Sequence, residues 1–508
     1  MSLVVRSRVV PREEADRALE PRDGLVLERP AGEATFEAAE GPVHDYVREV
    51  RVEDVGGGRV RVDETIRYRL ALPFFRWLFA IPFRLGLARD ARSAWWAPPQ
   101  RVDARGATAL ATLCAASVLG GYLASLLSHT IAFAGREFDV SATAQGVAGI
   151  AARVGGVVAL VLTAAAADRW GRRRVILWAA GLAIASTLTT AGTPSLPWFT
   201  ASQAIARSIA VALLVCIAIA AAEEMPKGSR AYAVALLGLS TALGSGIGIM
   251  ALPLADLGVW GWRLLYVIPV IAAPVVWRMA VHLPETRRFS APHARATFAG
   301  HHGRFWLLAV SGMLASLFIA PATFFLNRFL LDERGFSATG VSLFTILTST
   351  PAVIGVVIGG RLADTRGRKP VGASTLFVAT IIVVLAFNSS GAALWVWALV
   401  GSVIGAAGAP ALGVYGPELF PTSLRGKVGG LLSVAALVGS AVGLIIGGIA
   451  ADTPGGLSSA LIPLAAGPLI VAVLVLLLYP ETAGRELEDL NPEDRPEAQH
   501  GGSERRPS

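Results

Sequence analysis

Two arginines, Arg153 and Arg207, stand inside long apolar segments of the chain. An ionisable side chain is costly inside a membrane and marks a functional site by default. The apolar segments contain no Asp or Glu between their ends, so the sequence offers these guanidiniums no carboxylate at the same depth. A guanidinium presents a planar fork of donors that suits a carboxylate or a phosphate. The pattern therefore predicts an anionic substrate, with an organic acid as the first choice.

Each arginine also has a simpler interpretation. Arg207 would be satisfied by helix carbonyls or by water in a wet cavity. Arg153 lies about ten residues into its segment, or about 15 Å deep at 1.5 Å per residue, and would instead face a neighbouring helix. These alternatives stay open on the sequence alone.

The overall composition is that of a membrane protein. The chain has 508 residues, of which 54% are apolar and 16% charged, and a mean hydropathy of +0.57. An ordinary soluble domain carries about 25% charge. The two cysteines exclude a disulfide scaffold. The sequence shows no P-loop, nucleophile motif, metal-ligand spacing or nucleic-acid-binding motif, so we expect no enzymatic activity, no cofactor, no bound metal and no nucleic-acid partner.

The apolar residues are grouped in windows long enough to cross a membrane. A spanning helix needs about 20 mainly apolar residues. Twelve such windows follow one another, at about 107–131, 142–166, 175–192, 198–221, 231–252, 263–281, 304–327, 339–360, 371–388, 391–412, 428–450 and 458–479. We therefore predict an all-α membrane protein with twelve transmembrane helices.

The distribution of basic residues predicts the orientation of these helices. Residues 106–480 hold 23 Lys and Arg against 12 Asp and Glu. With the N-terminus in the cytoplasm, 17 of these bases fall at cytoplasmic helix ends and loops and only 4 at outer ends. Cytoplasmic loops of membrane proteins are enriched in Lys and Arg. We therefore expect a multi-pass protein of the plasma membrane with both termini in the cytoplasm.

Three short motifs occur twice, at an offset of 195 or 196 residues, after the same span of each half. Because six spans separate the copies, the two halves have the same orientation and form a parallel repeat. The first pair is Ala167-Asp168 and Gly171-Arg172-Arg173 with Ala363-Asp364 and Gly367-Arg368-Lys369. The second is Glu223, Pro226 and Arg230 with Glu418, Pro421 and Arg425. The third is Pro284-Glu285-Thr286 with Pro480-Glu481-Thr482.

These motifs resemble those of a known family. Residues 168–174 and 360–369 look like the loop motif of the major facilitator superfamily. Residues 417–426 and the two Pro-Glu-Thr segments are similar to its sugar-porter and metabolite:proton symporter branches, as is Gly261-Trp262-Arg263. The resemblance covers about residues 107–490. It implies a transporter that works by alternating access, with a central site between two six-helix bundles.

The repeated acids and bases collect at the cytoplasmic helix ends. We interpret them as two ion-pair clusters that latch the halves closed on the inside, a role that the resemblance also implies. The alternative is that they only anchor helix ends and orientation. The members are Asp168, Arg172, Glu223, Arg230 and Glu285 in the first half, and Asp364, Arg368, Glu418, Arg425 and Glu481 in the second.

The resemblance also implies which polar residues line the central cavity, because the first, fourth, seventh and tenth spans line it in that family. The expected substrate-binding residues on these spans are Tyr122, His129, Gln203, Arg207, Asn327 and Arg328. Arg153, in the second span, joins them as an intramembrane cation. His129 is also a candidate proton carrier, because a histidine titrates near physiological pH. Its alternative is a residue of the membrane interface.

Departures from the family pattern bear on the substrate. Gln203 stands where many sugar porters carry an arginine, and Ala164 stands where the loop motif has a glycine. The first span lacks the Asp of many proton-coupled relatives, and the seventh lacks the glutamine pair of sugar porters. The fifth lacks the Gly-Pro signature of drug:proton antiporters. A sugar is therefore poorly supported, and uptake is favoured over export.

The ends of the chain are polar. Residues 46–55 and 59–70 alternate charged and apolar side chains around Gly56-Gly57-Gly58, which predicts a β-hairpin. An aromatic and basic stretch at 73–84 predicts an interfacial segment that contacts anionic lipid. We divide the chain into a cytoplasmic α+β extension (1–105), two bundles (106–283 and 304–480), a linker (284–303) and a disordered tail (481–508).

Together these features predict a secondary active transporter that moves a small organic solute, an organic anion or carboxylate, across the plasma membrane. Proton-coupled uptake is favoured, and we expect a monomer whose partners are the substrate, protons and membrane lipid. One alternative is a drug or lipid exporter of the same fold, and another is a sugar transporter. An alternative of a different class is a membrane sensor that uses the N-terminal extension.

Overall fold

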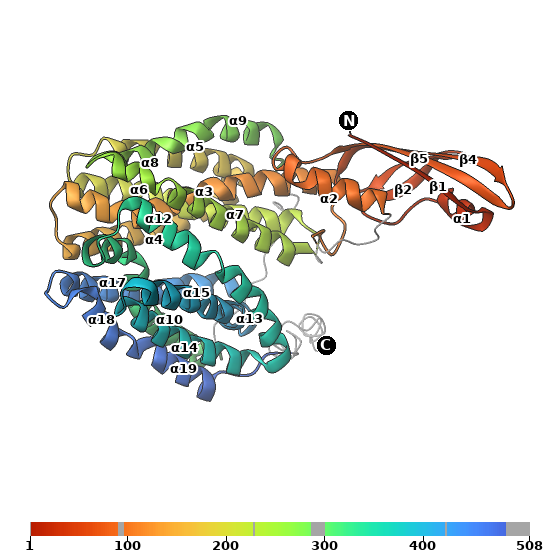
Figure 1. Cartoon of the computed structure of the whole chain (residues 1–508). Coiled ribbons are helices and arrows are strands. Elements are labelled where there is room, and N and C mark those ends of the chain that lie inside the picture. The colour runs from red at the N-terminus through yellow and green to blue at the C-terminus, as the bar shows by residue number, and fades with distance from the viewer. Residues whose placement is uncertain (1, 90–95, 227–228, 286–299, 422–423, 484–508) are drawn as a thin grey trace, which may run out of the picture.

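The computed structural model describes residues 2–89, 96–226, 229–285, 300–421 and 424–483. Two helical bundles lie side by side, and an antiparallel sheet projects from one end of the first bundle (Figure 1). We call that end of both bundles the module end and the opposite end the far end. Most of the predicted linker and tail lies outside the described residues.

The first bundle contains five long helices and a sixth span that is broken into short pieces. The long helices are α3 (Ala104–Glu137), α4 (Ala142–Trp170), α5 (Arg172–Ala191), α6 (Leu196–Glu224) and α7 (Arg230–Met250). The short 3-10 helix η2 (Leu252–Leu257) follows α7 at the far end. The sixth span consists of η3 (Gly261–Arg263), α8 (Leu264–Val267), η4 (Ile268–Ala272) and α9 (Ala273–His282).

The second bundle repeats this arrangement with more interruptions. Its elements are α10 (His302–Phe324), α11 (Leu326–Arg328), the π-helical turn η5 (Phe329–Glu333), α12 (Ala338–Ser349), α13 (Ala352–Arg366), α14 (Arg368–Phe387), α15 (Gly391–Gly413), α16 (Tyr415–Glu418), α17 (Arg425–Ala451), α18 (Gly456–Leu464) and α19 (Ala466–Leu478). The eighth span is divided into α12 and α13 at Pro351. A proline lacks the N–H that would continue the helical hydrogen bonds.

Eleven helical segments of the described chain are long and apolar enough to cross a membrane. Each coincides with one of the twelve predicted spans. The remaining predicted span coincides with α4, a helix of 29 residues that is not among the eleven. The structure therefore confirms a helical membrane protein with a small N-terminal sheet, and it meets the predicted count in eleven of twelve spans.

Small residues let the helices of each bundle approach closely. A side chain at Gly439 or Gly443 of α17 would collide with the backbone of α10. A side chain at Gly121 of α3 or Gly244 of α7 would likewise collide with the backbone of the other helix. Small residues at such spacing allow close packing of membrane helices. Gly439 and Gly443, one turn apart on α17, therefore allow α17 to pack closely against α10 within the second bundle.

The N-terminal module is a five-stranded antiparallel sheet in the order β1-β5-β4-β3-β2. Its strands are β1 (Ser2–Pro11), β2 (Leu27–Gly32), β3 (Thr35–Glu40), β4 (Val43–Gly56) and β5 (Arg59–Leu70). Two helices accompany them, α1 (Arg12–Ala18) and α2 (Arg76–Ala88). The predicted hairpin is present as β4 and β5, and Gly56, Gly57 and Gly58 at its turn all have positive φ.

Candidate substrate-translocation site

The two bundles meet at the far end, where a carboxylate of each caps a helix of the other. Asp452, after α17, accepts hydrogen bonds from the backbone N–H groups of Ala142 and Thr143 at 2.7 and 2.9 Å. Its second oxygen also accepts the Thr143 hydroxyl at 2.7 Å. These residues begin α4. The first N–H groups of a helix lack intrahelical partners and attract negative charge.

The second contact repeats the first with the roles of the bundles exchanged. Asp256, in η2 of the first bundle, accepts the N–H groups of Ala338 and Thr339, both at 2.8 Å, and the Thr339 hydroxyl at 2.7 Å. Each residue of this contact lies 196 positions from its counterpart in the other. We call these two caps together the far-end lock.

Further charges support the lock. Arg136 of α3 pairs with Asp332 of η5 at 2.7 Å, and Arg328 lies 3.3 Å from Asp332 and 3.6 Å from Asp452. Burial acts to raise the pKa of the Asp452 carboxyl, but its hydrogen bonds from Thr143 and from the backbone, with the charge of Arg328, lower that pKa below its ordinary value. The carboxylate form therefore favours the closed far end. Further hydrogen bonds between the two bundles lie at this end, including that from the Ser342 hydroxyl to the Ile249 carbonyl at 2.8 Å.

The two arginines of the apolar segments lie near each other in the first bundle, and Arg153 reaches a helix of the second. The Arg153 guanidinium of α4 stacks on the ring of Phe324 in α10, 5.1 Å from its centroid. It also donates to the carbonyl of Gly149 at 3.2 Å. Arg207 of α6 donates from Nε to the carbonyl of Ala124 in α3 at 3.2 Å. The two cations are near enough to repel each other, and neither has a carboxylate partner among the described residues.

The other predicted binding residues divide into two groups. Tyr122 and Gln203 are buried within the first bundle, where the Tyr122 hydroxyl donates to the Leu265 carbonyl at 2.7 Å and the Gln203 amide donates to the Thr190 hydroxyl at 2.9 Å. Both are thus occupied by partners of their own bundle. A helix that is apolar on all sides does not reveal which of its faces meets the other bundle, so the sequence could not separate these residues from Arg207.

His129 and Asn327 join the two bundles near the far end. The Asn327 amide donates to the backbone carbonyl of His129 at 2.9 Å. The His129 ring lies beside Gly248 of α7, and its Nδ1 atom is buried without a hydrogen-bond partner. The Arg328 guanidinium lies near the carboxylates of Asp332 and Asp452 at the far end, and not beside Arg153 or Arg207.

The described members of the two predicted ion-pair clusters bond within their own bundles at the module end. Arg172 pairs with Glu223 at 3.2 Å, and Arg368 pairs with Glu418. The side chains of Asp168, Arg230, Asp364 and Arg425 lie outside the described part of the structure. The predicted latch between the two clusters stays a prediction.

The Pro-Glu-Thr glutamates cap the helices that follow the loop motifs. Glu481 accepts the backbone N–H groups of Arg368 and Lys369 at 2.9 and 3.1 Å, and Glu285 accepts that of Arg173 at 3.2 Å. Burial acts to raise the pKa of Glu481, but its backbone hydrogen bonds lower it overall. Gly367, with φ of 100°, leaves room for this carboxylate. These residues hold spans of one bundle together.

Sequence reasoning missed the far-end lock and Phe324. A signal for the lock is present, because Ser141-Ala142-Thr143 recurs as Ser337-Ala338-Thr339 at the same offset of 196 that relates Asp256 to Asp452. Phe324 has no such signal. Its role follows from the packing of α10 against α4.

Comparisons with known proteins agree with this architecture. The profile of the Major Facilitator Superfamily matches residues 108–348 and 308–499. A "Chloramphenicol resistance protein" of Streptomyces lividans is 29% identical over 344 residues, covering 64% of this chain and 84% of that protein. A "Putative metabolite transport protein" of Haemophilus influenzae is 26% identical over 360 residues, covering 66% of this chain and 86% of that protein.

Solved structures show the same fold. The inward-open xylose transporter XylE from E. coli gives a TM-score of 0.62 at 17% identity, covering 75% of this chain and 98% of that one. A bacterial homologue of the human lysosomal transporter Spinster, inward-facing and unoccupied, gives 0.60 at 16% identity, covering 77% and 98%. Since the family profile spans both bundles, the chain belongs to the Major Facilitator Superfamily and is a multi-pass membrane transporter.

Proposed function

We propose that the protein moves a small organic anion across the plasma membrane, and that Arg153 and Arg207 bind the anion. The observation that carries this proposal is the pair of neighbouring guanidiniums with no described carboxylate partner. A buried cation is costly unless it is paired. A substrate carboxylate supplies the missing charge, and the free donors of both guanidiniums can bond to its two oxygens.

Phe324 supports a site between the bundles. Its ring belongs to the second bundle, whereas Arg153 and Arg207 belong to the first. An anion bound at the arginines therefore lies beside a surface that moves when the bundles rock. The ring gives an apolar part of the substrate a wall to pack against, so we expect an organic acid with an apolar body rather than a small inorganic anion.

Alternating access follows from the far-end lock. With the module end in the cytoplasm, as the excess of basic residues there favours, the lock closes the outer face and the site communicates with the cytoplasm. Breaking the two caps and closing the module end exposes the same site to the outside. A few kcal/mol is enough to exchange two such states. The ion-pair clusters then stabilise the state in which the module end is closed.

Proton coupling is assigned to His129, and we expect uptake by a monomer. The buried Nδ1 atom of this histidine lacks a partner, and its carbonyl takes part in the contact between the bundles. Protonation at this position adds a positive charge at the far-end contact and so changes the balance between the two states.

A second candidate is export of an uncharged drug. A relative that is 29% identical is named a chloramphenicol resistance protein, and the sequence covers most of that protein. Transport of chloramphenicol that survives loss of Arg207 would favour this candidate, because a neutral substrate does not need the cation.

The decisive test is uptake into proteoliposomes with an imposed inward proton gradient. Labelled lactate, succinate and benzoate are compared with xylose and chloramphenicol, for the wild type, Arg207→Ala and Arg207→Lys. A matched control is Arg12→Gln, which removes an arginine that is 78% exposed on the module. We expect acid uptake that is lost in Arg207→Ala, partly kept in Arg207→Lys and unchanged in the control. Acid uptake that is absent, or equal in Arg207→Ala and the wild type, contradicts the anion site.

A further inference from the structure

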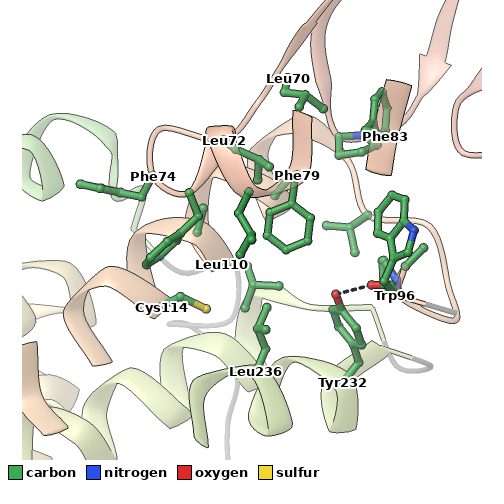
Figure 2. Close-up of a pocket in the computed structure, with 18 of the residues that line it drawn as sticks. Leu70, Leu72, Phe74, Phe79, Phe83, Trp96, Leu110, Cys114, Tyr232 and Leu236 are labelled. Carbon is green, nitrogen blue, oxygen red and sulfur yellow. Dashed lines mark hydrogen bonds between the residues drawn. The ribbon is translucent and has the colours of Figure 1, made fainter. Parts of the chain in front are cut away.

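A cavity of about 470 Å³ lies between the N-terminal module and the first bundle. Figure 2 shows its walls, which come from α2 and the loop before it, from the segment around Trp96, and from the module ends of α3 and α7. Cavities of this size typically bind small molecules or single chains. None of the groups assigned above to transport lines it.

The walls of this module cavity are apolar. Leu72, Phe74 and Phe79 contribute from the module side, and Leu110 and Leu236 from the bundle. The polar groups in the wall are already bonded to protein. The Tyr232 hydroxyl donates to the Trp96 carbonyl at 2.9 Å, as Figure 2 shows, and the Ser240 hydroxyl donates to the carbonyl of Leu236 at 2.9 Å. The cavity therefore suits an apolar chain rather than a polar ligand.

The rim of the cavity opens along α7 and carries a basic side chain. Leu239 and Leu243 of α7, a spanning helix, are 58% and 53% exposed where they line the cavity. Arg278 stacks on the cavity-lining Phe74, 6.0 Å from its centroid. Arg76 and Trp77 of α2 line a separate hollow beside Ser2 and Tyr68 of the sheet. Aromatic and basic side chains together mark the headgroup zone of a membrane.

We propose that the module cavity binds one acyl chain of an anionic phospholipid, whose headgroup contacts Arg278. The apolar walls select a chain, the exposed rim on α7 connects the cavity with the hydrocarbon layer, and Arg278 complements the negative charge of the headgroup. The lipid acts as a filler between module and bundle, because walls that face an empty apolar space lose their packing contacts.

The position of the cavity gives the bound lipid an influence on transport. Its bundle wall includes α7, and the chain continues from α7 into η2, which carries Asp256 of the far-end lock. Helix α7 therefore lines the lipid cavity at its module end and contacts the second bundle at its far end. This consequence rests on the proposed function, whereas lipid binding itself does not.

The test is photo-crosslinking of the full-length protein in phosphatidylcholine vesicles. Trace phosphatidylglycerol with a photoreactive acyl chain is compared with phosphatidylcholine that carries the same chain, and labelled peptides are mapped. We expect phosphatidylglycerol to label the module ends of α3 and α7. Ala111→Phe, which fills the cavity, should abolish this label. Ile271→Phe, at a position that is 78% exposed on η4, is the matched control and should leave it unchanged.

Two surface variants keep the test valid if Ala111→Phe fails to fold. Arg278→Gln should reduce phosphatidylglycerol labelling about fivefold and leave phosphatidylcholine labelling unchanged, because one basic residue contributes about a factor of five to such binding. Arg76→Gln, in the separate hollow beside the sheet, should leave both unchanged. Equal labelling by the two lipids, labelling elsewhere on the chain, or displacement of the label by a free fatty acid but not by phosphatidylglycerol overturns the proposal. None of these outcomes depends on substrate transport.

Discussion

Arginines withdrawn from the surface occur in both the module and the first bundle, where Arg48 is buried and Arg153 and Arg207 are half-buried. Their surroundings differ. Arg48 of the module has no exposed side-chain surface, and its guanidinium donates to Glu28 from Nε at 2.9 Å and from Nη2 at 2.7 Å. It also donates to the carbonyls of Ala18 and Glu20 at 2.7 and 2.8 Å. Among the described residues, Arg153 and Arg207 of the first bundle each donate one hydrogen bond, to a backbone carbonyl.

The difference separates a structural cation from one that is free to take a ligand. Every nitrogen of Arg48 has a partner, so the network fixes α1, β2 and β4 relative to one another. Its neighbour Tyr46 bonds to the same carboxylate, and burial with the charge of Glu28 raises the pKa of the Tyr46 hydroxyl. The bundle arginines keep most of their donors for a partner that comes and goes.

The largest effect is expected when the paired arginine loses its carboxylate. Glu28→Gln removes the carboxylate that bonds to Nε and Nη2 of buried Arg48 and leaves only the more distant Glu64, 3.9 Å from Nη1, so it should destabilise the module by about 3–5 kcal/mol. Hydrogen exchange of residues 2–70 measures this loss. Glu37→Gln is the control, because its pair with Arg29 is exposed and should contribute about 0–1 kcal/mol. Equal protection in both variants would mean that Arg48 is not held by Glu28.

The unpaired arginines should behave in the opposite way. Arg207→Ala removes a buried charge without stranding a carboxylate, so the midpoint of thermal unfolding should stay the same or rise. Anion uptake should weaken about tenfold to hundredfold, since a hydrogen bond to a charged group contributes about 1.5–3 kcal/mol. Uptake kinetics and unfolding are measured on the same preparation. A large loss of stability would make Arg207 a structural residue like Arg48.

The far-end lock lies between these extremes, because its partners are satisfied in one state and separate in the other. Asp452→Asn and Asp256→Asn each remove a charge from a helix N-terminus, worth about 0.3–2 kcal/mol, so the far end should open in a larger fraction of molecules. Distances between spin labels on the two bundles report this. Asp139→Asn, an exposed far-end control at positive φ that asparagine tolerates, should change nothing.

The smallest effect concerns pH. The pKa of Asp452 is lowered when the far end is closed. The Asp452 carboxylate therefore stabilises the closed state at any pH above 3.8, the ordinary pKa of an aspartate. This stabilisation is lost only when the pH falls through the lowered pKa. In a His129→Asn background, the spin-label distances should therefore be constant between pH 7 and pH 5. A shift within that range would show that Asp452 is not the titrating group of the lock.

The sequence predicted those features that depend on composition and repetition. The apolar windows and the offset of 196 residues predicted the spans and the two bundles. The sequence singled out Arg153 and Arg207 but did not predict that they lie near each other. The direction of each side chain was not predictable, because helices that are apolar on all sides do not indicate which face meets another helix. Gln203 consequently faces Thr190 inside its bundle. The far-end lock was not predicted, because it joins residues about 80 and 310 positions apart through backbone N–H groups, which every residue type except proline carries.

The far-end lock is symmetric, and this symmetry has a consequence for how six-helix units can assemble. Each bundle contributes one aspartate and one Ser-Ala-Thr helix start, so the contact surface of one bundle is complementary to itself. Self-complementary surfaces are those that build two-fold dimers. A single six-helix unit with both features carries what it needs to bind a second copy of itself. The covalent chain thus holds two such surfaces together in the arrangement that a two-fold dimer of one unit would adopt.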